Sequence, residues 1–285
     1  MTLRAIKAQH PALRDDIGDL VTRRPLPGPA VEQVDPFLFL NHHGPQTYPP
    51  NNRGLPFGPH PHRGFETVTF ILEGSLSHAD SGGHESVIHA GGVQWMTAGR
   101  GVVHAELSPE EFKRTGGQIE ILQLWLNLPS RLKMTAPAYV GLQREQIPSI
   151  DLGDKVTMNL IAGKWDGAIG PINPLLDIFM STVNLEAGGH AVFEVAPERN
   201  IFMYLVRGEL LVNNHPAHEH HLIEFESSAE RVELCSPQGA LILFGHALAL
   251  REPVVSYGPF VMNTREEIHQ AIRDYQAGKF TEPLR

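Results

Sequence analysis

The chain is poor in the features of secreted and membrane proteins. Its single cysteine, Cys235, excludes an internal disulfide, so we expect a reducing, cytoplasmic compartment. No apolar run approaches the length of a membrane span, and residues 1–7 lack the apolar core of a signal peptide. We therefore expect no membrane association.

Basic residues are also in short supply. Lysine and arginine number 23 against 32 aspartates and glutamates, which gives a net charge of -9. Direct binding to nucleic acid depends on basic patches that neutralise phosphates. We therefore expect no direct nucleic-acid partner.

Glycine and proline are plentiful, with 27 and 23 residues. Such a composition favours many turns, and hence many short strands. A length of 285 residues allows one large domain or two of ordinary size, each with its own core.

Two short segments carry residues that can bind a metal, His60-Pro61-His62 and His104-Ala105-Glu106. Side chains two residues apart on an extended strand point to the same face. Pro59 and Pro61 favour extended backbone at the first pair. On facing strands the two pairs would bring three imidazoles and one carboxylate to one point.

Three neutral ligands and one anion suit a divalent first-row metal and leave coordination positions open for water, oxygen or substrate. A chain with 16 histidines also contains such pairs by accident. The surroundings favour a site, because each pair lies beside a glycine turn and a strand-like run, as in the mouth of a small β-barrel.

The motifs around both pairs resemble those of the cupin superfamily, and more closely those of pirin. They are PHPHRGFETVTF at 59–70 and VQWMTAGRGVVHAE at 93–106. Near the C-terminus, 252–255 and 258–264 resemble the signature of the pirin C-terminal domain. The resemblance covers most of the chain.

The resemblance to pirin implies the metal ligands His60, His62, His104 and Glu106. General cupins use a glutamate shortly after the histidine pair, which here would be Glu66, so the pirin pattern leaves Glu66 a structural role. The implied cofactor is one divalent first-row metal. Iron(II) is expected, with manganese, nickel, copper or zinc as alternatives.

An internal sequence similarity suggests a duplicated fold. The segment 70–76, FILEGSL, is similar to 204–210, YLVRGEL. Aligning Gly74 with Gly208 places Glu194 and Ala196 at the positions of the histidine pair. We therefore predict a second copy without metal ligands.

The predicted fold is all-β, a bicupin of two stacked antiparallel β-barrels of jelly-roll type with a C-terminal helix. An N-terminal metal-binding cupin domain is expected over 1–135 and a C-terminal pirin-type cupin domain over 150–285. For the helix, Thr264 and Glu267 form a capping box and Gly278 can end it. Ile268, Ile272 and Tyr275 are expected to form its apolar face.

Two other groups of histidines have less specific patterns. The segment 213–221 is rich in histidine and could bind metal, but Asn213-Asn214 and Pro216 are typical of a hairpin turn in solvent. His42 and His43 follow an apolar run, so either the rim of a site or ordinary packing is open to them.

The resemblance implies two functions of different classes. In the first, the protein is a quercetin 2,3-dioxygenase that opens a flavonol ring with O₂, and Glu106 is catalytic because it accepts the hydroxyl proton of this small aromatic substrate. In the second, the site is metal- and redox-dependent and serves a regulatory module that binds another protein. We expect a monomer in either case.

Overall fold

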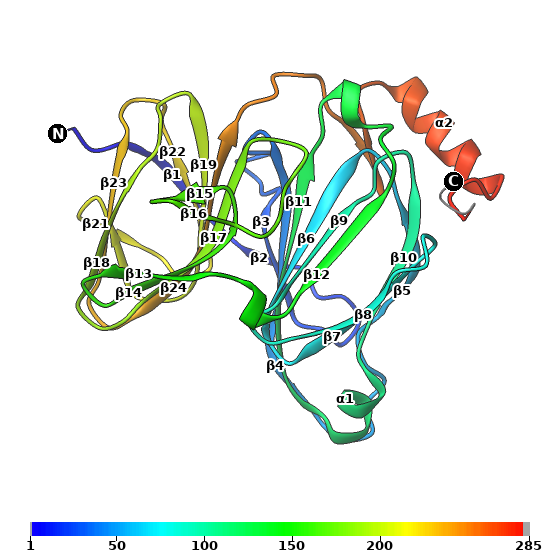
Figure 1. The fold of residues 1–285 in the computed structure, drawn as a ribbon, viewed down its shortest axis with the longest axis horizontal. Helices are drawn as coiled ribbons and strands as arrows, with labels where there is room; N and C mark the ends of the chain where they lie inside the picture. The colour runs from blue at the N-terminus through cyan, green and yellow to red at the C-terminus, as the bar shows by residue number, and fades with distance from the viewer. Residues whose placement is uncertain (1, 282–285) are drawn as a thin grey trace. The chain divides into compact units, whose positions relative to one another are not determined.

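The computed structural model describes residues 2–281, and their regular secondary structure is mostly β (Figure 1). The described part contains two α-helices, α1 (Glu110–Thr115) and α2 (Arg265–Gln276), and short 3-10 turns at Ser130–Leu132 and Arg144–Gln146. The all-β prediction is confirmed. Among the described residues, no helix has the length and apolar character needed to cross a membrane.

The chain divides into two compact units, of which one contains 14–23, 39–144 and 250–285. We call it the histidine unit. A seven-stranded antiparallel sheet has the order β12 (Ala138–Leu142), β9 (Val93–Thr97), β6 (Phe65–Glu73), β11 (Gly117–Asn127), β4 (Phe37–Tyr48), β3 (Thr22–Leu26) and β2 (Leu13–Arg14). A four-stranded sheet has the order β5 (Phe57–His62), β10 (Val102–Leu107), β7 (Ser75–Asp80) and β8 (Glu85–His89).

The second unit, with 1–13, 24–38 and 145–249, repeats the plan of a seven-stranded and a four-stranded sheet. The larger sheet has the order β1 (Ile6–Pro11), β22 (His221–Phe225), β19 (Arg199–Gly208), β24 (Ala240–Leu248), β17 (Ile178–Leu185), β14 (Val156–Ala162) and β13 (Ser149–Gly153). The smaller has the order β18 (Gly189–Glu194), β23 (Arg231–Ser236), β20 (Leu210–Val212) and β21 (His215–Ala217). The second unit also contains a hairpin of β15 (Lys164–Trp165) and β16 (Ala168–Ile169). A further hairpin, of β25 (Val255–Tyr257) and β26 (Phe260–Met262), belongs to the histidine unit.

Each unit encloses its own apolar core between its two sheets. In the histidine unit Ile71 of β6 and Ile121 of β11 pack in one cluster with Leu76 of β7 and Ile88 of β8. The second unit has a larger cluster with contributions from both of its sheets. Leucine, isoleucine, valine and phenylalanine supply most of the side chains in both clusters.

The units differ from the predicted linear division into 1–135 and 150–285. Strand β1 pairs with β22 of the second unit, and residues 250–285 belong to the histidine unit. The cause lies in specific bonds of the C-terminal segment. The backbone N–H of Val261 donates to the carbonyl oxygen of Arg63, and the ammonium of Lys133 donates to the carbonyl oxygens of Gly64 and Val261.

Helix α2 begins as predicted and differs in its buried face. Thr264 and Glu267 form the capping box, and Ile268 is buried. Tyr275 is 40% exposed, and its ring lies 5.7 Å from that of the buried Phe280, so it lies at the edge of the predicted apolar face. Its neighbour Asp274, which was not predicted to be buried, is only 7% exposed. Asp274 is buried because it accepts a hydrogen bond from Arg63 at 2.8 Å.

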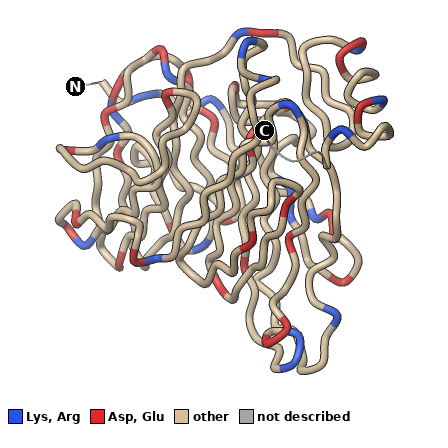
Figure 2. The backbone as a smooth tube through the Cα atoms, turned by 45° about the vertical axis from the view of Figure 1, so that its right-hand side comes forward, with Lys and Arg blue, Asp and Glu red and all other residues tan. Residues whose placement is uncertain are grey.

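The histidine-rich segment 213–221 forms a hairpin turn, as predicted. Asn213 and Asn214 connect β20 to β21 with φ angles of 52° and 65°, which asparagine tolerates better than most residues. Figure 2 shows acidic and basic positions interspersed along the chain.

We predict that the Asp274 carboxylate stabilises the fold in a pH-dependent way. Burial opposes its ionisation, but hydrogen bonds from Lys279, Arg63 and Gln270 hold its pKa below the ordinary value of 3.8. A lowered pKa means that the stabilisation is present above about pH 4 and is lost as the pH falls toward the folded-state pKa. Asp274→Asn should therefore lower the free energy of unfolding at pH 7 by about 2 kcal/mol, the scale of hydrogen bonds to charged groups.

Urea denaturation between pH 3 and pH 7 measures this effect. The difference between Asp274→Asn and the wild type should shrink toward the acid end of that range. Glu110→Gln, at the exposed ion pair with Lys113, is the control and should change stability little at any pH. A deficit for Asp274→Asn that is equal at all pH values would contradict the prediction.

Candidate metal centre

The site is built on two paired strands, β5 and β10. In their antiparallel register His60 lies opposite His104, and His62 lies opposite Val102. Pro59 and Pro61 belong to the extended strand β5, as their restricted φ angles predict. The strand pairing therefore brings the histidines of two distant motifs to one face.

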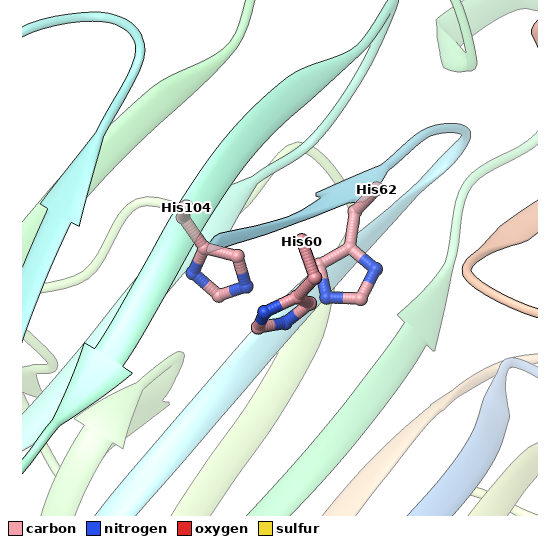
Figure 3. Close-up of side chains that lie close together, drawn as sticks. All are labelled: His60, His62 and His104. Atoms are coloured by element: carbon pink, nitrogen blue, oxygen red, sulfur yellow. The ribbon is translucent and has the colours of Figure 1, made fainter. Parts of the chain in front are cut away.

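The three imidazoles converge (Figure 3). His60, His62 and His104 each offer a ring nitrogen, and these nitrogens all lie within 4.8 Å of one another. His62 and His104 are buried, and His60 is partly exposed. Such spacing is what three ligands around one ion require, since metal–nitrogen bonds are about 2 Å long.

Backbone carbonyls orient two of the rings. Nδ1 of His60 lies 2.7 Å from the carbonyl oxygen of Gly58, and Nδ1 of His62 lies 3.3 Å from that of Pro259. A carbonyl can only accept, so Nδ1 carries the proton in both rings and Nε2 keeps its lone pair. Such outer hydrogen bonds fix the tautomer that a metal-binding histidine needs.

Burial keeps the rings of His62 and His104 uncharged. It lowers the pKa of His62 to about 3, and the neighbouring His60 adds to the shift. The pKa of His104 is lowered well below its ordinary value by burial and by the nearby His62, His60 and His78. Neutral imidazole is the form that binds a metal.

His104 gives the test of whether a metal fits. Both of its ring nitrogens are buried, and neither has a hydrogen-bond partner in the part of the chain that the structure describes. A buried polar atom without a partner costs free energy. An ion held by the three rings would satisfy one of these nitrogens, so the donor set fits a divalent first-row metal.

Glu106, the fourth predicted ligand, lies on the same strand but is not part of the group of converging ligand atoms. Its carboxylate accepts hydrogen bonds from the hydroxyl of Thr69 at 2.9 Å and from the amide of Gln123 at 2.5 Å. Each oxygen retains a further lone pair, so the carboxylate can still accept a proton or bind a metal. Its ligation stays a prediction.

Thr69 and Gln123 were not singled out in the sequence. They belong to β6 and β11, whose neighbouring positions are almost all apolar. A polar side chain at an inward position of such a strand was the available signal. Without the register of the sheet, nothing showed that both side chains meet Glu106.

A second group missed in the sequence lies beside His104. The ring of His78 stacks on Tyr139 with centroids 3.9 Å apart and lies 5.4 Å from the ring of His104. Burial opposes the ionisation of Asp80, but hydrogen bonds from His78 and His84 lower its pKa to about 2. A carboxylate thus anchors this side of the site.

Glu66 lies away from the histidines. Phe65, whose ring lies 5.1 Å from that of His62, and Thr69, which bonds to Glu106, mark the inner face of β6, and strand alternation places Glu66 on the other face. There it accepts a hydrogen bond from Thr97 at 2.7 Å, and burial raises its pKa to about 7. This position agrees with the structural role expected for Glu66.

His42 and His43 are packed residues. His42 is fully buried and lies 3.0 Å from Glu120, and Nδ1 of His43 lies 2.8 Å from the hydroxyl of Thr22. Of the two alternatives left open by the sequence, the structure favours packing.

The described residues of the second unit contain no counterpart of the three histidines. An open cavity of about 750 Å³ includes Glu194 and Ala196, the positions equivalent to His60 and His62, together with Arg199 and His246. Among the described residues, the one cluster with metal-binding geometry is His60, His62 and His104. The histidines of 213–221 do not form another.

The chain has relatives over nearly its whole length. It is 38% identical over 250 residues to a Pseudomonas aeruginosa protein named "Putative quercetin 2,3-dioxygenase", with 87% of each chain covered. The crystal structure of quercetin 2,3-dioxygenase from Acinetobacter baumannii is 31% identical, with a TM-score of 0.93 over 99% of this chain and 100% of that one.

A nickel(II) complex of a bacterial pirin from Escherichia coli has the same fold. It is 20% identical, with a TM-score of 0.66 over 87% of this chain and 99% of that one. The structural matches confirm the predicted bicupin fold.

Family comparison gives the same assignment for both halves of the chain. The pirin family model matches residues 19–126, and the model of the pirin C-terminal cupin domain matches residues 180–281. The first match contains the two histidine motifs, and the second contains the C-terminal segments that resemble the pirin signature. The chain belongs to the pirin family.

Proposed function

We propose that this pirin is a metal-dependent dioxygenase that cleaves a flavonol ring with O₂. The observation that carries the proposal is the set of three converging imidazoles, with the Glu106 carboxylate on the same strand as His104. Three histidines fill only part of the coordination sphere of a first-row metal and leave room for a substrate. The name of the Pseudomonas relative and of the Acinetobacter structure supports the same chemistry.

The chain's own residues would bind and deprotonate the substrate. A metal held by the three histidines supplies a Lewis acid and a path for electrons between the flavonol and O₂. Glu106 lies on the same strand as His104 and can accept the proton of the flavonol hydroxyl. Thr69 and Gln123 hold its two oxygens in place during that transfer.

Iron(II) is the metal we propose for this site. Imidazole nitrogens with one carboxylate are typical ligands of non-haem iron in oxygenases. Because the same donors bind other first-row ions, the metal found after purification depends also on the supply in the cell.

We predict that His62→Ala removes the metal and leaves the fold intact. The lost ring leaves too few donors for tight binding, and the strand β5 keeps its pairing with β10. Elemental analysis and circular dichroism of the purified variant measure the two effects. His215→Ala, in the exposed hairpin turn, is the control and should retain the metal. Stoichiometric metal in His62→Ala would show that the ligand assignment is wrong.

We predict one metal ion for each chain, bound in the histidine unit. Glu194 and Ala196 replace the histidine pair in the second unit, and the side chains that line the cavity there do not form a converging group of ligands. Anomalous scattering from crystals grown with a first-row metal should show a single peak at the three histidines. A second ordered peak in the second unit would contradict the prediction.

We predict that Glu106→Gln slows flavonol cleavage by roughly 10² or more, the range of general-base loss. Glutamine keeps the size of the side chain and removes its charge and basicity. Oxygen consumption with quercetin, normalised to bound metal, measures the effect. Glu66→Gln, on the outer face of β6, is the control and should keep wild-type turnover.

The wild-type protein provides the stricter test of the dioxygenase proposal. It should consume oxygen with a flavonol when loaded with at least one of Fe(II), Mn(II), Ni(II) or Cu(II). If it consumes none with any of them, the proposal is wrong, and a metal-dependent module that binds a regulatory protein becomes the better account.

A further inference from the structure

Gln94 is a buried amide next to the candidate site, and nothing in the described structure satisfies it. Its side chain is 2% exposed, and neither its amide oxygen nor its amide nitrogen has a hydrogen-bond partner among the described residues. The conclusion does not depend on which way the amide is turned, since both atoms lack partners. An unsatisfied buried amide is costly, so it calls for an explanation.

The strand register places Gln94 in line with the groups that hold Glu106. On β6, Thr69 pairs with Gln94 of β9 on one side and with Gln123 of β11 on the other. Directly paired residues present their side chains on the same face of a sheet. Thr69 and Gln123 both donate to Glu106, so Gln94 lies on the inner face of the histidine unit.

Gln94, Thr69 and Gln123 thus form a row across three strands. This row separates two different environments. One step along β6 toward the histidines, Thr67 pairs with Trp125, whose ring lies 5.4 Å from that of His62. One step the other way, Ile71 pairs with Ile121 in the apolar core. The row is therefore the polar boundary between the metal ligands and the core.

Solvent reaches this face of the unit at the Gln123 end of the row, two strands from Gln94. Gln123 and Trp125 are only partly buried, although both belong to a strand that is otherwise buried at almost every position. A small molecule that binds at the histidines can therefore extend toward the row.

We propose that Gln94 is a specificity-determining residue that receives a pair of adjacent hydroxyl groups on an aromatic ring of the substrate. An amide presents one donor and one acceptor side by side. A vicinal diol of a phenolic ring offers the complementary acceptor and donor, whereas an apolar ring would leave the amide unsatisfied. The inference rests on the proposed function for the identity of the substrate class, and it concerns binding alone.

The test compares two flavonols on protein loaded with Zn(II), which is redox-inert and so excludes turnover. Both quercetin and 3-hydroxyflavone have a 3-hydroxyl and a 4-keto group, and only quercetin has the adjacent ring hydroxyls. Gln94→Met should weaken quercetin binding about tenfold, the size expected when uncharged hydrogen bonds are lost. Its affinity for 3-hydroxyflavone should equal that of the wild type, as measured by spectroscopic titration.

Thermal unfolding of the ligand-free protein gives a second readout. Methionine has nearly the shape of glutamine and no amide to satisfy, so Gln94→Met should raise the melting temperature. If Gln94 were needed only for the fold, the substitution would lower the melting temperature. Trp95→Phe, on the other face of β9, is the matched control and should leave both flavonol affinities unchanged.

The outcomes separate this inference from the dioxygenase proposal. If Gln94→Met binds both flavonols like the wild type, or weakens both equally, the role of Gln94 in specificity is wrong. The same conclusion follows if the wild type binds neither flavonol. If the wild type binds quercetin through Gln94 but consumes no oxygen with any metal, the dioxygenase proposal fails and the inference stands.

Discussion

The antiparallel pairing of β5 with β10 is the constraint on which the candidate site depends. It sets His60 opposite His104, and strand alternation then places His62 on the same face. A shift of one residue in this register would turn one pair of ligands to the other face. The prolines of β5 and the glycine turn before β10 hold the two segments in conformations that favour the pairing.

The C-terminal segment 259–261 supports the pairing of β5 with β10, although it belongs to neither strand. Pro259 orients the ring of His62, and Val261 bonds to the backbone of Arg63 immediately after it. At Gly64, with a φ of 92°, a Cβ would lie 2.0 Å from the carbonyl oxygen of Val261. Only glycine permits this approach, so the histidine motif and the C-terminal signature are parts of one packed structure.

The sequence was sufficient for the features that depend on local pattern. The extended histidine pair, the capping box at Thr264 and the turn at Asn213-Asn214 each follow from the preferences of a few neighbouring residues. Features that depend on distant partners were not accessible. The burial of Asp274 requires Arg63, and the anchoring of Glu106 requires the register of β6 and β11 against the four-stranded sheet. No local pattern encodes such contacts, because they arise only when the strands are placed in order.

A comparison of one histidine from each unit shows how the two units differ. In the second unit burial, aided by Arg199, lowers the pKa of His246 to about 3, and its Nδ1 accepts a hydrogen bond from the Arg199 guanidinium at 2.7 Å. A side chain of the protein thus supplies a hydrogen-bond partner for the His246 ring. His104 in the histidine unit is equally uncharged, yet neither of its nitrogens has a partner among the described residues. Buried polar groups without partners cost stability. His104, and Gln94 in the row that holds Glu106, are therefore the groups in the histidine unit that a bound metal and a bound substrate would satisfy.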